Sequence, residues 1–131
     1  MYYDMQSVFS MVVRDFRGWG LEVKFQKDVE VEDVISTGSF AVVYKGVLKG
    51  KHQVAIKKLL NMMGAPMTIK MILDFKSEIS FLKDFHHPNI VGILATSCNP
   101  LCVMLEYCAR GTLFSICHPE GFFFTAFFLN L

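Results

Sequence analysis

Hydrophobic residues recur along this chain with two different periods, and these periods predict its first elements. Apolar residues between Met5 and Phe16 repeat every three or four positions, which predicts an amphipathic helix that ends near Gly18 and docks on the rest of the domain. From Trp19 to Phe25 apolar and polar residues alternate instead. That pattern predicts a strand or strand-like segment with one buried side.

Three apolar, β-branched runs follow, and each predicts a strand: Val29 to Ile35, Val42 to Leu48 and Gln53 to Leu59. The connections between them are short, so neighbouring strands are expected to be antiparallel.

A helix is predicted next, from about Thr68 to Phe85, because apolar residues return at helical spacing and the chain then reaches Pro88. Two more apolar runs, Ile90 to Ala95 and Leu101 to Leu105, are separated by residues 96–100 and predict a hairpin. The order of elements is three strands, a helix and two strands. We therefore divide the chain into a leader segment over 1–28, a main domain over 29–115 and an atypical Phe-rich tail over 116–131.

Composition restricts the possible functions. A chain of 131 residues fits a single small domain. Thirteen Lys and Arg oppose twelve Asp and Glu, and the net charge of +1 gives no field that would attract nucleic acid or an anionic membrane. Hydrophobic residues make up 53% of the chain, above the roughly 45–50% that is usual for soluble domains. This excess indicates that part of the apolar surface binds a partner.

Cysteine spacing and terminal composition predict the compartment. The four cysteines have no CxxC pair and no histidine at a matching distance, so we expect reduced thiols and no zinc site. The first residues lack the apolar core of a signal peptide. Residues 121–131 are very apolar but fall short of the roughly 20 residues that a membrane-spanning helix needs. These features predict a cytoplasmic protein without a membrane span.

Two features could carry chemistry. The hairpin from Ser36 to Ala41 contains Gly38, and a glycine lets backbone N–H groups approach anionic oxygens. Lys57 closes a buried strand, from which its ammonium can reach a phosphate, and Glu78 on the predicted helix is its natural partner. Taken separately, the loop would be an ordinary β-hairpin, and Lys57 and Glu78 would be unrelated surface charges. The hairpin, strand and helix follow one another in the order of a protein kinase, and this resemblance favours the shared site.

Residues 35–113 resemble the N-terminal lobe of a protein kinase. The strand VAIK ends at Lys57, and the glycine-rich pattern GxGxxGxV aligns with a loop that keeps only Gly38 of its three glycines. HPNIV after the helix and LEYC after the last strand resemble the tyrosine-kinase-like group. The resemblance implies an α+β fold: a five-stranded antiparallel sheet with one packed helix, preceded here by the amphipathic helix and followed by the apolar tail.

The resemblance also implies ATP as the ligand. Lys57 and Glu78 would form the ion pair of the active kinase state. Leu105 would be the gatekeeper, and the Glu106 carbonyl and the Cys108 amide would hydrogen-bond the adenine. Leu82 and Ile93 would belong to the hydrophobic spine, while His86 and His87 would have a structural role in the turn. The full set of expected ATP contacts is Ile35, Gly38, Phe40, Val43, Ala55, Lys57, Leu105, Glu106 and Cys108.

The sequence reaches Leu131 without an HRD-like catalytic loop or a DFG-like magnesium motif. Two hypotheses follow. The chain is a truncated ATP-binding lobe, inactive alone, whose full-length parent uses ATP and Mg²⁺ to phosphorylate protein Ser/Thr or Tyr. Alternatively, it is a non-catalytic, pseudokinase-like module that acts on another kinase or regulator through its exposed lower face. Neither hypothesis involves nucleic acid.

Overall fold

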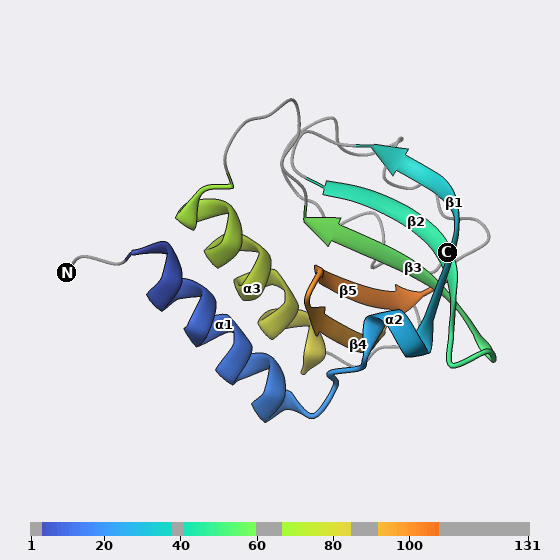
Figure 1. The fold of residues 1–131 in the computed structure, drawn as a ribbon, viewed down its shortest axis with the longest axis horizontal. Helices are drawn as coiled ribbons and strands as arrows, with labels where there is room; N and C mark the ends of the chain where they lie inside the picture. The colour runs from blue at the N-terminus through green and yellow to red at the C-terminus, as the bar shows by residue number, and fades with distance from the viewer. Residues whose placement is uncertain (1–3, 38–40, 60–66, 85–91, 108–131) are drawn as a thin grey trace.

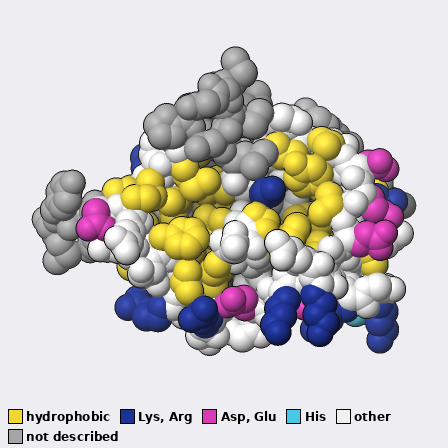
Figure 2. Space-filling model, in the orientation of Figure 1, with side chains coloured by type: hydrophobic (Ala, Val, Ile, Leu, Met, Phe, Trp, Pro, Cys, Tyr) yellow, Lys and Arg dark blue, Asp and Glu magenta, His cyan; other side chains and the backbone are white. Residues whose placement is uncertain are grey.

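The computed structural model describes residues 4–37, 41–59, 67–84 and 92–107. The elements follow one another in the order α1 (Met5–Trp19), α2 (Phe25–Asp28), β1 (Val29–Thr37), β2 (Ala41–Leu48), β3 (His52–Leu59), α3 (Ile69–Lys83), β4 (Ile93–Cys98) and β5 (Leu101–Glu106). α1 and α3 lie on one side of a twisted sheet, apart from the short α2 (Figure 1), and hydrophobic side chains gather over α3 and over the sheet in the same view (Figure 2). None of these helices is long and apolar enough to cross a membrane.

The five strands form one sheet in the order β1-β2-β3-β5-β4, and every neighbouring pair is antiparallel. β2 and β3 pair over their whole length, from Ala41 opposite Leu59 to Leu48 opposite His52. β5 lies between β3 and β4, so β3 is the central strand (Figure 1). The predicted α+β fold with a five-stranded antiparallel sheet and a packed helix is confirmed.

Apolar side chains cover both faces of the sheet. One face packs against α1 and α3, and its buried residues on the strands are Val43, Ala55, Leu59, Leu101, Val103 and Leu105. The other face buries a second cluster, against which Val23, Phe25, Val29 and Tyr44 pack; its members are Leu48, Val54, Ile56, Ala95, Cys102 and Met104. Alternation along β3 and β5 sends successive side chains to opposite faces.

The helix boundaries follow local capping. Asp4 begins α1, because its side chain accepts a hydrogen bond of 2.7 Å from the Ser7 amide. Gly20 ends α1 in the left-handed region at φ 72°, a conformation that glycine adopts without steric cost. The helix therefore includes Trp19 and extends slightly beyond the predicted end near Gly18. α3 covers most of its predicted range and ends at Lys83.

The segment from Trp19 to Phe25, predicted to be a strand or strand-like, forms no strand and is strand-like only where Glu22 bridges to β4. Trp19 belongs to α1, Glu22 forms only an isolated bridge with Thr96, and Phe25 begins the short helix α2. The alternating apolar residues serve two different clusters: Trp19 packs with the helices, whereas Val23 and Phe25 pack on the opposite face of the sheet. The apolar residues of this segment alternate because they are buried in two clusters on opposite faces of the sheet, and not because the segment is a paired strand.

The second hairpin also differs from its prediction. β4 continues through Cys98, so the turn contains only Asn99 and Pro100 rather than residues 96–100. Thr96 and Ser97 pair with Val103 and Cys102 and are buried, although both are polar. Pairing with β5 on one edge, and the hydrogen bonds of Thr96 with Leu21 and Val23 on the other, extend β4 past the end of the apolar run.

Gly46 allows β1 to approach β2 closely, and its replacement should destabilise the fold. A Cβ at Gly46 would lie 2.5 Å from the Glu30 carbonyl oxygen and 2.5 Å from Ile56 Cδ1. We expect Gly46→Ala to lower the free energy of unfolding by about 1–3 kcal/mol, because the backbone of β1 has to shift. Urea unfolding measures this change. Gly92→Ala is the matched control, since a Cβ there meets only the movable end of the Glu106 side chain. Equal losses in both variants would contradict the explanation.

Candidate nucleotide-binding site

Lys57 lies at the centre of the sheet, on the face that packs against α3. It is opposite Val43 of β2 and opposite Val103 of β5. Directly opposite residues of antiparallel strands point to the same face, so the ammonium is surrounded by apolar neighbours on both sides. Only 2% of Lys57 is exposed. A buried lysine of this kind is costly unless an anion accompanies it.

Glu78 of α3 provides a carboxylate for Lys57. The two side chains lie close enough for each to alter the pKa of the other. Burial lowers the pKa of Lys57 to about 7, and the Glu78 carboxylate opposes this change. Burial likewise raises the pKa of Glu78 to about 7, against the effect of Lys57. Glu78 Oε2 is buried and accepts no hydrogen bond from the described residues.

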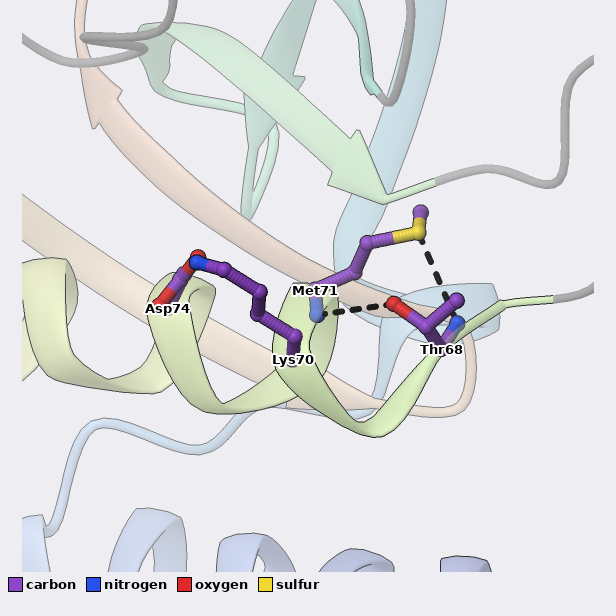
Figure 3. A network of polar contacts seen from close by, with 4 residues as sticks. All are labelled: Thr68, Lys70, Met71 and Asp74. Carbon is purple, nitrogen blue, oxygen red and sulfur yellow. Dashed lines mark hydrogen bonds and ion pairs between the residues drawn. The ribbon is translucent and has the colours of Figure 1, made fainter.

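A third charge, which the sequence analysis did not include in the site, affects Glu78. Asp74 precedes Glu78 by one helical turn and raises the pKa of that carboxyl by repulsion. Asp74 itself pairs with Lys70 at 2.8 Å in the first turns of α3 (Figure 3). The spacing of four residues from Lys70 to Asp74 and from Asp74 to Glu78 is the sequence signal that could have identified it.

Capping fixes where α3 begins, and the buried apolar stripe along the helix sets the side that carries Glu78. Thr68 Oγ1 accepts a hydrogen bond of 3.1 Å from the Met71 amide, and Met71 Sδ accepts one of 3.5 Å from the Thr68 amide (Figure 3). This reciprocal arrangement is a capping box in which the Met71 side chain replaces the usual Glu or Gln. Ile72, Phe75, Ile79 and Leu82 then turn their side chains into the core.

The structure brings together four of the residues expected to contact ATP. Val43, Ala55, Lys57 and Leu105 lie on one face of β2, β3 and β5, where Ala55 is opposite Leu105 and Val43 is opposite Lys57. All four are buried, Leu105 completely. Ile35 stands apart, because it lies on the edge strand β1 at a break in the pairing with β2 and is 41% exposed.

The remaining expected contacts lie at the ends of the described ranges or beyond them. Glu106 is the exposed last residue of β5, and its amide donates a hydrogen bond of 3.0 Å to the Gly92 carbonyl. The Tyr107 amide donates one of 3.3 Å to the Gln53 carbonyl, which holds the end of β5 against β3. Gly38, Phe40 and Cys108 lie outside the described residues, as do His86 and His87.

Leu82 and Ile93, expected as spine neighbours, both belong to the cluster between the sheet and the helices. Leu82 is buried on α3, and the partly buried Ile93 begins β4 and packs against the same cluster. Both residues thus contribute to the hydrophobic core.

Lys57 and the apolar residues around it have the chemistry that suits the phosphates and the adenine of a nucleotide. An anion beside Lys57 would raise its depressed pKa, so that a larger fraction of the lysine is protonated when a phosphate is bound. Val43, Ala55 and Leu105 on the same face are small or branched apolar residues, the kind of side chain that lines a purine pocket. No cluster of three or more His, Cys, Asp or Glu that could bind a metal ion occurs in the described ranges.

Comparison with known proteins identifies the class. The family model described as "Protein tyrosine and serine/threonine kinase" matches residues 29–121, which include the whole sheet and α3. The chain therefore belongs to the protein kinase family. The matched segment covers an N-terminal lobe, which makes this a partial kinase domain.

Individual relatives agree with this assignment. The chain is 38% identical over 93 residues to a "Probable serine/threonine-protein kinase" of Dictyostelium discoideum, covering 71% of this chain and 7% of that protein. It is 38% identical over 99 residues to "Cell division control protein 7" of Schizosaccharomyces pombe, covering 71% of this chain and 9% of the relative. It is also 36% identical over 89 residues to "Tyrosine-protein kinase transmembrane receptor Ror" of Drosophila melanogaster, covering 66% and 13%. The chain thus spans only a small part of these relatives.

Proposed function

We propose that this chain binds ATP as the nucleotide-binding lobe of a protein kinase. The observation that carries the proposal is the burial of Lys57 beside Glu78 in the middle of an apolar sheet face. Lys57 would hold the phosphates, and Glu78 would keep the ammonium in place. Val43, Ala55 and Leu105 would pack against the adenine. Glu106 and Cys108 would contribute backbone hydrogen bonds to its edge.

Phosphoryl transfer is a proposal for a protein that joins this lobe to a catalytic lobe. Transfer to Ser, Thr or Tyr requires an aspartate that orients the hydroxyl, together with Mg²⁺ ligands. The 131 residues contain no HRD- or DFG-like motif that would supply them. We therefore expect binding without transfer from this chain alone. The group within the kinases remains a proposal as well, with HPNIV and LEYC in favour of the tyrosine-kinase-like group.

A non-catalytic binding module is the second candidate. Ser36 and Ala41 occupy positions where the family pattern has glycine, and Ala41 is 4% exposed at the start of β2. The added Cβ atoms restrict the loop that would cover the phosphates. A chain that keeps the fold but no longer binds ATP would act by binding another kinase or a regulator.

Titration of the purified chain with a fluorescent ATP analogue tests the proposal. We expect weak, saturable binding that unlabelled ATP competes away. Adenosine and inorganic triphosphate should each compete less well than ATP, because each occupies only one part of the site. A folded chain that gives no competable signal would exclude the nucleotide site and favour the binding module.

A further inference from the structure

The side of α3 that faces away from the sheet is covered by α1. Three residues of α1, Val8, Val12 and Phe16, are 1%, 0% and 0% exposed and belong to the same cluster as the buried residues of α3. The two helices lie side by side next to the sheet, with α3 nearer to the strands (Figure 1). α3 is therefore enclosed between the sheet on one side and α1 on the other.

Polar contacts fix the register between the two helices. Asp15 and Lys76 form an ion pair of 2.7 Å, with 24% and 21% of their side chains exposed. Further along both helices, the Lys83 ammonium lies 5.4 Å from the centre of the Trp19 ring. The contacts advance in the same direction, so α1 and α3 run parallel. Hydrogen bonding to Lys76, with a smaller contribution from Arg14, lowers the pKa of Asp15.

The Asp15–Lys76 pair lies across α3 from the candidate site. Lys76 and Glu78 are two residues apart, and two residues of an α-helix turn through about 200°. Lys76 therefore points to α1 while Glu78 points to the opposite side, where Lys57 lies. A rotation or sliding of α3 would change both contacts together.

The segment after α1 is itself attached to the sheet. The Thr96 amide donates a hydrogen bond of 2.9 Å to the Leu21 carbonyl, and the Val23 amide donates one of 3.0 Å to the Thr96 carbonyl. These two bonds join the end of α1 to the edge strand β4. α1 therefore provides a fixed support on the sheet against which α3 rests.

We propose that α1 is a positioning element for the nucleotide site, and that the Asp15–Lys76 ion pair holds α3 in the rotation that presents Glu78 to Lys57. The inference rests on the proposed nucleotide binding. Asp15 is a positioning residue, since it acts through α3 and not on the ligand. Weakening this contact loosens α3 and lowers nucleotide affinity without any change in the site residues themselves.

The test uses Asp15→Lys in the full chain, with two readouts: hydrogen–deuterium exchange of the α3 amides and affinity for the fluorescent ATP analogue. We expect faster exchange in α3 and an affinity about fivefold lower, a typical coupling between distant sites. Asp15→Asn should give a smaller change in the same direction. The charge-swapped variant Asp15→Lys/Lys76→Asp should restore both readouts. Ser10→Lys, on the exposed face of α1, is the control and should change neither.

Each outcome decides between the inference and the function on which it rests. Unchanged α3 exchange in Asp15→Lys would overturn the inference, as would faster exchange with unchanged affinity or a swap that fails to restore binding. A wild-type chain that binds no nucleotide would overturn the proposed function instead. In that case the exchange of α3 in Asp15→Lys and in the charge swap still decides whether α1 positions α3.

Discussion

Lys57→Met is expected to lower the affinity for ATP by about 10- to 100-fold, because a hydrogen bond to a charged group contributes about 1.5–3 kcal/mol. Methionine keeps the length of the side chain and its apolar contacts with Val43 and Val103 but removes the ammonium. The fold should persist, since the lysine is surrounded by apolar side chains that methionine can pack against. Competition binding and circular dichroism measure the two effects.

Lys58→Met is the matched control for this prediction. Lys58 follows on the same strand but points to the opposite face of the sheet, where it is half-buried. Its replacement changes the net charge by the same amount and should leave ATP affinity within about twofold of the wild type. Equal affinities of Lys57→Met and wild type would count against the site. Equal losses in the two lysine variants would indicate a general effect of charge.

The sequence predicted the sheet well because each strand has its own local signal. β2 and β3 are apolar, β-branched and joined by a short turn, so their pairing needed no information from distant residues. The position of Lys57 opposite Val43 follows from this register. α3 could be predicted equally well, because its apolar spacing indicates a helix and the proline after it indicates where the helix ends.

The errors occurred where distant contacts decide the local structure. The segment after Trp19 lies at an edge where two clusters meet, and an alternating pattern there does not specify a strand. The pairing of Asp15 with Lys76 depends on how two helices that are far apart in the sequence come together. The docking of the N-terminal helix could be predicted from its apolar face, but its partner charges could not.

Replacing both charges of the candidate site should stabilise the chain while it abolishes ATP binding. The variant Lys57→Met/Glu78→Leu removes a pair whose desolvation is unfavourable, and such replacements are often stabilising by about 1–4 kcal/mol. We expect the lower part of this range at pH 7, because Glu78 is only half-buried. Glu78→Leu alone should be less favourable than the double variant, since it leaves Lys57 buried without the carboxylate. Urea unfolding of the wild type and the variants compares these stabilities.

The same two charges make the free energy of unfolding depend on pH, and the direction follows from their pKa shifts. Burial lowers the pKa of Lys57 from 10.5 to about 7, so between these values the unfolded chain binds more protons, and stability rises with pH. Burial raises the pKa of Glu78 from 4.5 to about 7, so over that range the folded chain binds more protons, and stability falls as pH rises. Together the two groups predict a minimum in the wild-type free energy of unfolding near pH 7 that the double variant lacks. A wild-type curve without this minimum, or a double variant that keeps it, would contradict the prediction. Burial of Lys57 and Glu78 would then not lower the free energy of unfolding.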